Sequence, residues 1–365
     1  MQFIQIVPGL PPWVDGIGDY ALQLARRLRD EHGINTRFLV GDPAWMDASV
    51  EGFTAARVCQ RTAEALVKAI GEIQVKAGTG QLQLLVQFSV YGYEKRGCPF
   101  WLVRGLEKLS GERPERIHVA FHELENHGWK PWSSTFWVTK IQQNLIERVA
   151  KAARFKYTNA ELHRRKLEDW GVGRITLIPN FSTLGEPPEY PPFASRRRDV
   201  VIFGRRAQRQ WTYERGGKVL GSLCRKIDVT RIVDIGDPLE QDRKQAIYGI
   251  PIVRLGRLPE HEVNACMATS IASFMEYPVP LLTKSSVHSV SCAFGTVPFI
   301  FDRADKERSC SPLVTGEDFI PVGHDLSNLK LPDLESLSRK VFNNYQSRDS
   351  RTAATVIAEH MGLRG

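Results

Sequence analysis

The amino-acid sequence predicts an α/β protein with two domains, each built on a parallel β-sheet. Three observations carry this prediction. Strand and helix patterns alternate through the first half of the chain, a proline-rich stretch interrupts the alternation, and a second alternating series follows it. Alternation of this kind is typical of parallel sheets, because a crossover, usually a helix, joins consecutive parallel strands and covers one face of the sheet.

The first series begins with an apolar strand at 3–7, a loop rich in proline and glycine, and a helix over 17–33. In that helix Tyr20, Leu24 and Leu28 recur at helical spacing, and Gly33 ends it. The same patterns predict further strands at 35–40, 81–88, 117–122, 155–159 and 175–180, and helices around 62–76, 99–109, 137–153 and 160–170.

The stretch 181–199 contains four prolines and little periodicity, so it cannot continue a helix or a central strand. After it, strands are predicted at 199–204, 230–236, 250–256, 270–275 and 296–301, and helices near 215–226, 240–247, 260–268 and after 282. We therefore predict an N-terminal domain over 1–183, a linker over 184–198, a C-terminal domain over 199–340 and a C-terminal helix over 341–365.

The composition is that of an ordinary folded protein. The chain has 365 residues, of which 42% are hydrophobic and 25% charged, enough to bury a sizeable core. No run approaches the ~20 apolar residues needed to cross a bilayer, and the first residues lack the basic and apolar regions of a signal peptide. We therefore expect a cytoplasmic protein.

The net charge bears on the kind of partner, and the cysteine spacing bears on zinc sites and disulfides. The chain has 49 Lys and Arg against 41 Asp and Glu, a net charge of +8. This excess favours anionic partners, which include phosphorylated ligands, nucleic acid and anionic lipid headgroups. The six cysteines form no C-x-x-C pair, so we expect reduced thiols rather than a zinc site or a disulfide framework.

The loop at 8–20 places glycines where the first strand turns into the first helix. A ligand could there approach backbone N–H groups at the positive end of the helix. The dinucleotide fingerprint G-x-G-x-x-G is incomplete, since Ala21 stands in the place of the third glycine after Gly16 and Gly18. The loop fits a phosphate or sugar site, and it also fits a plain tight turn.

Five segments, taken in order, resemble family 4 retaining glycosyltransferases of the GT-B fold. They span residues 8–28, 119–129, 157–182, 201–206 and 254–263. Residues 178–180 resemble the Ile-Pro-Asn of the family's I-P-N-G-V stretch, although Phe181 replaces its glycine. The resemblance implies two Rossmann-like domains facing a central cleft, the first binding an acceptor and the second a nucleotide-sugar donor.

In the first domain, the resemblance implies a catalytic, sugar-binding role for His122, at the end of a predicted strand. It also implies that acceptor or sugar is bound by Trp13, Gly16, Ile17, Gly18 and Tyr20. From the residues alone, His122 could equally cap the strand end through hydrogen bonds, and His127 is a nearby competitor.

In the second domain, arginines follow the strand at 199–204. Guanidinium groups suit a diphosphate leaving group, because they stay charged and bind phosphate oxygens in pairs. The resemblance gives Arg205 this catalytic role together with Arg209, which stands in place of the family's lysine, and puts Gly204 and Arg206 at the donor. Arg257 and Leu258 would contact the nucleotide base. The plainer interpretations are an exposed basic turn and a structural turn.

The donor segment at 273–301 departs from the family pattern. Glu276 keeps the first acidic position of the family's E-x7-E segment, but Lys284 stands eight residues later where the second glutamate, a ribose ligand, is expected. Lys284 therefore puts the usual ribose contact in question and indicates a variant donor site. Backbone N–H groups, hydroxyls and the lysine charge could still hold a diphosphate at a helix N-terminus, through Leu282, Thr283, Lys284 and Ser285.

The resemblance implies a hexosyltransferase-like enzyme that needs no metal and no cofactor. It would move a sugar, with retention, from a nucleoside-diphosphate sugar to a hydroxyl of a saccharide or glycolipid, in polysaccharide or glycolipid synthesis. Two alternatives stay open: a catalytically inert GT-B-like protein that binds a nucleotide sugar or a partner, as Lys284 suggests, and a dinucleotide-dependent oxidoreductase. We expect no nucleic-acid partner, and the positive charge leaves peripheral association with the inner membrane face open.

Overall fold

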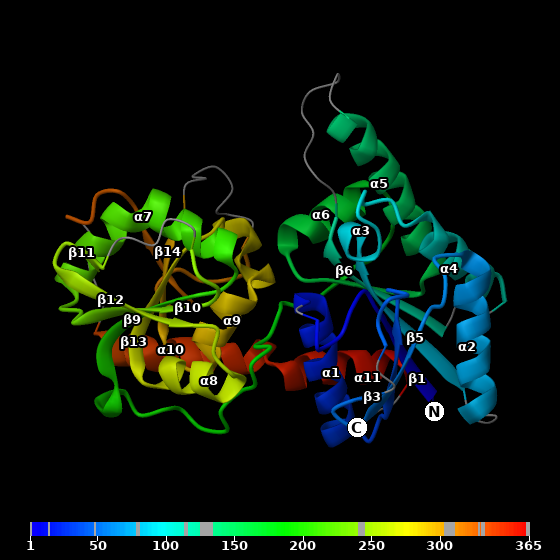
Figure 1. The fold of residues 1–365 in the computed structure, drawn as a ribbon, viewed down its shortest axis with the longest axis horizontal. Helices are drawn as coiled ribbons and strands as arrows, with labels where there is room; N and C mark the ends of the chain where they lie inside the picture. Colours follow the sequence, from blue (N-terminus) through cyan, green and yellow to red (C-terminus); the bar gives the residue numbers. More distant parts are fainter. Residues whose placement is uncertain are drawn as a thin grey trace. The chain divides into compact units, whose positions relative to one another are not determined.

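The protein forms two compact units in the computed structural model (Figure 1). The structure describes residues 2–13, 15–46, 49–77, 81–112, 116–124, 134–239, 245–302, 311–327, 329 and 333–362. The first unit comprises Met1–Asn159, His163–Pro179 and Ser350–Gly365, and the second comprises Ala160–Leu162 and Asn180–Asp349. No helix in these described ranges is both long and apolar enough to span a bilayer.

The first unit is built on a sheet with the strand order β3-β4-β2-β1-β5-β6-β7-β8. Its strands are β1 (Gln2–Val7), β2 (Thr36–Val40), β3 (Ser49–Val50), β4 (Phe53–Arg57), β5 (Leu82–Ser89), β6 (Ile117–Glu123), β7 (Phe155–Thr158) and β8 (Thr176–Leu177). The short β3 pairs with β4 in antiparallel fashion, and the other pairings between these strands are parallel. Every residue of β5 is buried, as expected for a parallel strand covered on both faces.

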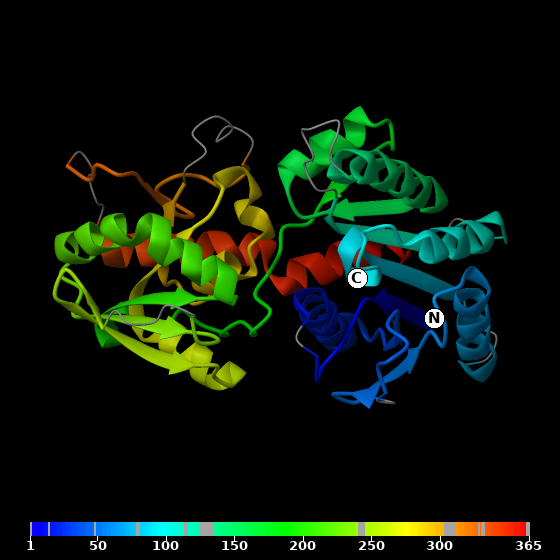
Figure 2. The same cartoon turned by 45° about the horizontal axis from the view of Figure 1, so that its top comes forward.

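Two hydrophobic cores cover the two faces of the first sheet. The helices of this part of the chain are α1 (Gly16–His32), α2 (Ala63–Ala77), α3 (Val90–Tyr93), α4 (Phe100–Glu112), α5 (Ser134–Ala152) and α6 (Glu161–Asp169). One core joins α2, α4 and α5 to the sheet, and the other joins α1 to it (Figures 1 and 2). Helix α1 begins where the Asp15 side chain accepts a hydrogen bond from the Ile17 N–H, and it ends at Gly33 with φ of 64°.

The last helix, α11 (Ser350–His360), belongs to the first unit. It packs beside α1, where Arg27 Nε donates to Ser350 Oγ at 2.8 Å (Figure 1). The Tyr157 hydroxyl lies 2.9 Å from both His118 Nδ1 and His360 Nδ1, so it links the sheet to α11. The segment predicted as one C-terminal helix over 341–365 is instead divided between α11 and a helix of the second unit, α10 (Leu334–Tyr345).

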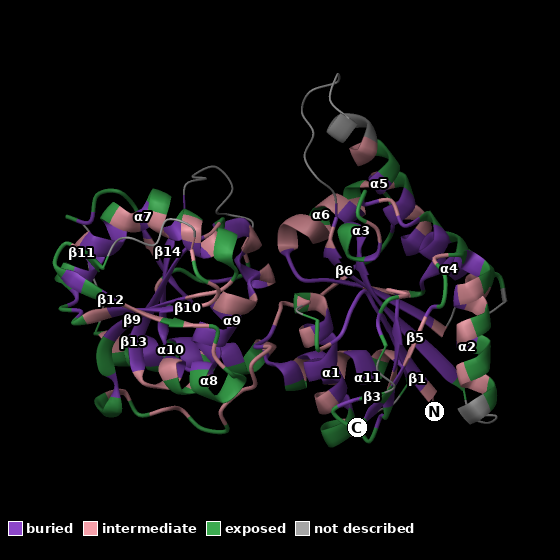
Figure 3. Cartoon of the chain, viewed as in Figure 1, coloured by how far each residue is buried: buried purple, intermediate pink, exposed green. Residues whose placement is uncertain are grey.

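The second unit has the strand order β11-β12-β10-β9-β13-β14-β15. Its strands are β9 (Arg197–Phe203), β10 (Arg231–Ile235), β11 (Ala246–Ile247), β12 (Ile250–Gly256), β13 (Ser270–Glu276), β14 (Val297–Phe301) and β15 (Ile320–Val322). Its helices are α7 (Arg206–Lys226), α8 (Glu260–Ala268), α9 (Ser286–Ala293) and α10 (Leu334–Tyr345). Apart from the β11–β12 pair, the pairings of these strands are parallel, and the strands of both sheets are largely buried (Figure 3).

The short helix predicted near 240–247 is not formed by its described residues. Ala246 and Ile247 instead form β11 and turn back into β12. The two residues between these strands, Tyr248 and Gly249, have φ of 49° and 82°, the left-handed conformation of a tight hairpin turn. The helical pattern was therefore overridden by a turn whose only obvious signal is Gly249.

The proline-rich stretch at 184–198 belongs to the second unit. Arg196 is buried there and donates to the carbonyl oxygens of Pro191, Ser270, Phe294 and Gly295. Burial lowers the pKa of Arg196 to about 10, so the side chain is still charged at neutral pH. The segment predicted as a linker is thus fastened to the sheet that follows it, because backbone carbonyls satisfy a buried cation.

A pH dependence of stability follows from the buried His118. Burial lowers the pKa of its ring to about 3, whereas an unfolded histidine titrates near 6.5. Below about pH 6.5 the unfolded chain binds a proton at this histidine and the folded chain does not. The free energy of unfolding therefore falls as the pH falls, by about 1.4 kcal/mol per pH unit. In urea unfolding, the free-energy difference between wild type and His118→Phe should shrink by about 2 kcal/mol between pH 7.5 and pH 5. A difference that stays constant with pH contradicts a neutral, buried His118.

Candidate functional site

The carboxyl ends of β9, β10, β12 and β13 lie at one edge of the second sheet, because these strands are parallel neighbours. In open α/β sheets ligands bind outside this edge. The predicted donor residues follow these strand ends, in the segments 204–209, 257–258 and 276–285. The structure thus gathers them within one unit.

Two glycine loops approach each other closely at this edge. Gly204 and Gly236 have φ of 133° and 141°, and a Cβ on Gly236 would lie 2.6 Å from the Gly204 carbonyl oxygen. A Cβ on Gly204 would lie 3.2 Å from Val287 in the first turn of α9. The N-termini of α7 and α9 are therefore neighbours, and both helix ends attract anions.

Arg205 occupies the N-cap position of α7 and is exposed. Among the described residues, its guanidinium has neither an ion pair nor a side-chain hydrogen bond. Since the helix N-terminus beside it also carries positive charge, Arg205 is placed to bind an anionic group at this edge.

The other three predicted arginines hold the loop 236–238 instead. Arg206 Nε donates to the Pro238 carbonyl at 2.7 Å, and Arg257 forms two hydrogen bonds of 3.1 and 3.0 Å with the Asp237 carboxylate. The hydrogen bond from Arg257 lowers the pKa of Asp237. Sequence reasoning missed Asp237, although an acidic residue two positions beyond a strand end was a usable signal.

Arg209 points inward from α7 rather than toward a ligand. Its side chain is 2% exposed, forms an ion pair with Asp234 of β10, and donates to the Asp237 carbonyl at 2.6 Å. Asp234 therefore competes with a ligand for Arg209, the residue expected to be catalytic, because a buried carboxylate requires a counter-charge. In this arrangement Arg209 shapes the edge on which Arg205 is presented.

Glu276, at the end of β13, is buried and fixed by α7. Its Oε1 lies 3.3 Å from Arg215 Nη1, and Gln208 and Thr212 of α7 bond its backbone carbonyl and N–H. The Arg215 guanidinium also lies over the ring of Trp211, 4.8 Å from the ring centroid. The acidic group expected near the donor therefore lies at the same edge as Arg205.

The segment 279–284 forms a 3₁₀ turn that leads into α9. Leu282 and Thr283 are buried, Lys284 is half-buried, and the Ser285 hydroxyl caps α9 by accepting from the His288 N–H. Asn180 holds this turn: its N–H donates to the Thr283 carbonyl at 2.8 Å and its Nδ2 to the Lys284 carbonyl at 2.7 Å. Asn180 was noticed only as part of the Ile-Pro-Asn resemblance, and its role as a clamp needed the structure.

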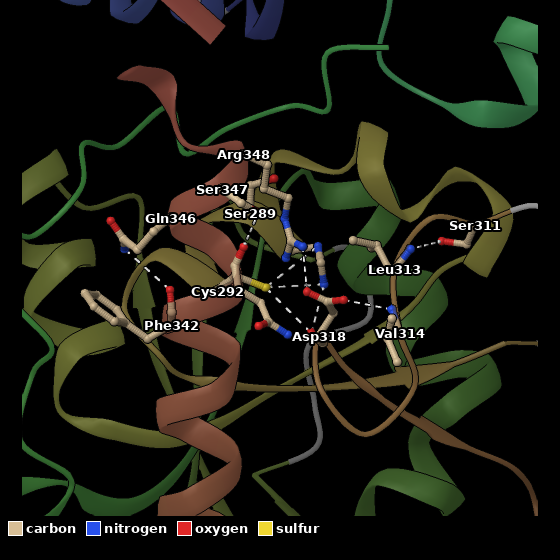
Figure 4. A network of polar contacts seen from close by, with 12 residues as sticks. Ser289, Cys292, Ser311, Leu313, Val314, Asp318, Phe342, Gln346, Ser347 and Arg348 are labelled. Carbon is tan, nitrogen blue, oxygen red and sulfur yellow. Dashed lines mark hydrogen bonds and ion pairs between the residues drawn. The ribbon is translucent and has the colours of Figure 1, made fainter. Parts of the chain in front are cut away.

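A buried polar cluster anchors the far side of α9. Arg348 Nη1 lies 2.6 Å from Asp318 Oδ1, and Cys292 lies beside them (Figure 4). His288 Nε2 is 3.4 Å from Cys292 Sγ. A Cys-His pair can act as nucleophile and base, but here burial raises the pKa of Cys292 to about 12 and lowers that of His288 to about 3. Both groups are neutral at pH 7, so this cluster holds α9 in place.

In the first unit, the structure brings His122 and the first turn of α1 together. His122 lies in β6 with 6% exposure, and its Nε2 is 2.7 Å from Gln87 Oε1. The Tyr20 and His122 rings form a T-shaped contact with centroids 4.9 Å apart. A Cβ on Gly18 would lie 2.4 Å from the Gly9 carbonyl oxygen, so this glycine is required by the close approach of loop and helix.

The remaining predicted residues of the first unit lie near the same turn. Gly16 is exposed at the start of α1, Ile17 is half-buried, and Trp13 is 40% exposed in the preceding loop. These positions fit contact with a ligand that reaches the N-terminus of α1. His127, the competitor of His122, lies outside the described residues.

Comparison with known proteins supports the fold. No protein-family model matches the chain, and no curated protein matches its sequence. A lipopolysaccharide outer core galactosyltransferase, WaaB, in its apo form is 13% identical over the full length of both chains, with a TM-score of 0.57. An α-glucosyltransferase solved with UDP and a 13-mer DNA containing a HMU base is 12% identical, also over both full chains, with a TM-score of 0.56.

A third solved structure has the same fold but a different reaction. UDP-GlcNAc 2-epimerase from Methanocaldococcus jannaschii is 10% identical over 98% of this chain and all of that chain, with a TM-score of 0.50. The predicted fold class is confirmed: the chain has two α/β units of the GT-B type. Because transferases and an epimerase share this fold, the reaction has to be argued from the site residues.

Arg209 in α7 and Arg205 at its N-cap should differ in how much their substitution changes stability. Arg209→Met leaves Asp234 buried without its partner, which should cost about 3–5 kcal/mol of unfolding free energy. Arg205→Ala removes an exposed side chain and should change stability by less than about 0.5 kcal/mol. Urea unfolding of both variants measures this, and Arg209→Met combined with Asp234→Leu should recover part of the loss. Equal stability of Arg209→Met and wild type would contradict the buried pair.

Proposed function

We propose that the protein is a retaining glycosyltransferase that moves a sugar from a nucleoside-diphosphate sugar to an acceptor hydroxyl. The observation that carries the proposal is the exposed Arg205 guanidinium at the N-terminus of α7, beside the N-terminus of α9. Two helix ends and an arginine form a positive site of the kind that a diphosphate leaving group requires. The GT-B fold supports the proposal without deciding the reaction.

The donor would lie along the carboxyl edge of the second sheet. Arg205 and the first N–H groups of α7 would bind the diphosphate, and Lys284 would add charge from the turn before α9. The half-buried Lys284 follows Thr283, whose backbone carbonyl Asn180 already fixes. Glu276, held in place by α7, would accept hydrogen bonds from donor hydroxyls.

In the transfer step, the bond between the anomeric carbon and the diphosphate oxygen breaks and a bond to the acceptor oxygen forms. The acceptor hydroxyl attacks from the face that the diphosphate leaves, and the diphosphate oxygen takes its proton. Positive side chains and helix ends stabilise the leaving charge, so no metal or cofactor is invoked. The first unit would bind the acceptor through the first turn of α1 and His122.

Saccharides and glycolipids are the acceptors that we favour, on the sequence resemblance and the net charge of +8. A glycolipid acceptor would place the reaction in the cytoplasm at the inner face of a membrane. DNA belongs in the acceptor panel as well, because one structural neighbour was solved with UDP and a DNA oligonucleotide.

An inert protein that only binds a nucleotide sugar is the second candidate. Lys284 stands where the family resemblance expects an acidic ribose ligand, and Arg209 is held by Asp234 instead of facing the edge. Both features remove groups that a standard donor site would use. Binding and turnover must therefore be measured separately.

Titration with nucleoside diphosphates tests the site. Arg205→Ala should weaken the preferred diphosphate by about 10- to 100-fold, since a charged hydrogen bond is worth about 1.5–3 kcal/mol, and Lys284→Gln should weaken it less. Arg197→Ala is the matched control: it removes one exposed arginine from the opposite end of β9 and should leave binding unchanged. The proposal fails if no diphosphate or nucleotide sugar raises the melting temperature of the wild type.

Turnover then separates the two candidates. Incubation of wild type with the bound nucleotide sugar and the acceptor panel should give a product with the anomeric configuration of the donor, lost in Arg205→Ala. Tight binding without transfer to any acceptor would support the inert protein.

A further inference from the structure

Three buried polar side chains form a line across adjacent strands of the first sheet. Gln5 lies in β1, Gln87 in β5 and His122 in β6, and these strands are neighbours. Gln5 pairs in register with Leu85, two residues before Gln87, and Gln87 pairs with Ala120, two residues before His122. A step of two residues keeps a side chain on the same face of a sheet, so Gln5 and Gln87 face the same way. The register of β5 and β6 shifts at His122, and the 2.7 Å contact of His122 Nε2 with Gln87 Oε1 places its ring beside them.

The hydrogen bonds along this line have a fixed direction. Gln5 Nε2 donates to the Ala21 carbonyl of α1 at 3.3 Å, and a carbonyl can only accept. The Gln5 amide therefore turns its oxygen toward Gln87, whose Nε2 donates to it at 2.7 Å. Gln87 then has its own oxygen left for His122, at 2.7 Å from Nε2.

The amide oxygen of Gln87 cannot donate, so the ring nitrogen that faces it must carry a proton. The reverse arrangement would set the Gln5 oxygen against the Ala21 carbonyl oxygen, two acceptors without a proton between them. In a site where these side chains are 0% (Gln5, Gln87) and 6% (His122) exposed, no bulk water can relieve that contact. The Ala21 carbonyl thus determines, through Gln5 and Gln87, which ring nitrogen of His122 carries the proton.

We propose that Gln5 and Gln87 are positioning residues that hold the neutral form of the His122 ring as the tautomer protonated on Nε2. The lone pair of the neutral ring then lies on Nδ1, which accepts a hydrogen bond and does not donate one. If the protein is the transferase proposed above, a saccharide hydroxyl that reaches Nδ1 donates the hydrogen bond to it and does not accept one. The tautomer itself does not depend on that function.

Histidine side-chain nitrogen NMR on the ligand-free protein at pH 7.5 tests the tautomer. The chain has nine histidines, and the signals of His122 are identified by their loss in His122→Asn. We expect correlations that show Nε2 protonated and Nδ1 unprotonated. In Gln5→Leu the Gln87 amide is free to turn over, so the single pattern should give way to a mixture of tautomers.

Two further variants distinguish an effect of hydrogen-bond direction on His122 from an effect of packing. Burial favours the protonated acid in Gln5→Glu, which can donate to the Ala21 carbonyl and accept from Gln87, so this variant should restore the wild-type pattern. Gln83→Leu is the matched control, because Gln83 lies on the same strand and contacts His118 Nε2 at 3.2 Å. It should change the signals of His118 and leave those of His122 unchanged.

A His122 ring protonated on Nδ1 overturns the proposal, as does an unchanged His122 pattern in Gln5→Leu. If Gln5→Leu does not fold, the wild-type spectrum and Gln5→Glu still decide, since both must show Nε2 protonated. These results are independent of turnover. An Nε2-protonated His122 in a protein that transfers no sugar refutes the proposed function and leaves this inference standing.

Discussion

Arg209 reaches from the first turns of α7 to Asp234 on β10, and the edge of the second sheet depends on this buried ion pair. One partner alone would be a buried, uncompensated charge, so the helix and the strand are held together at this point. The same guanidinium bonds the Asp237 carbonyl and thereby fixes the loop that Arg206 and Arg257 also hold. Arg209 is buried in this pair, whereas Arg205, at the N-cap of α7, is exposed at the same edge.

Each unit has polar groups arranged at the carboxyl edge of its own sheet, and the two sets differ in kind. In the second unit charges dominate: arginines, a lysine and helix ends surround the acidic groups Asp237 and Glu276. In the first unit neutral groups dominate, because Gln5, Gln87 and His122 are buried and linked by directed hydrogen bonds. The charged groups of the second unit suit an anionic ligand, and the neutral groups of the first unit suit hydroxyl groups.

The alternation of elements could be read from the sequence because it follows from local patterns. Apolar runs such as β5 and the helix-ending Gly33 act within a few positions, so they predicted a strand and a helix end correctly. The attachment of 184–198 and the return of α11 could not be read in this way. Both rest on contacts between residues far apart in the chain, such as Arg196 with Phe294 and Arg27 with Ser350.

The candidate site was predictable to the same limited extent. Sequence placed Arg205 and Arg209 equally near a ligand, because both follow the strand at 199–204, and it did not show which one faces a buried acid. Asp234 and Asn180 act through partners 25 and more than 100 residues away, which no local pattern reveals. The low identity to proteins of the same fold adds no residue roles, so side-chain contacts carry the argument.

Hydrogen–deuterium exchange with and without a saturating nucleoside diphosphate tests most directly where the ligand binds. The account predicts slower exchange at the start of α7, in the loop 236–238 and in the turn before α9, with the amino ends of the same strands unaffected. Protection confined to the first unit, or no protection from any nucleoside diphosphate, would contradict it.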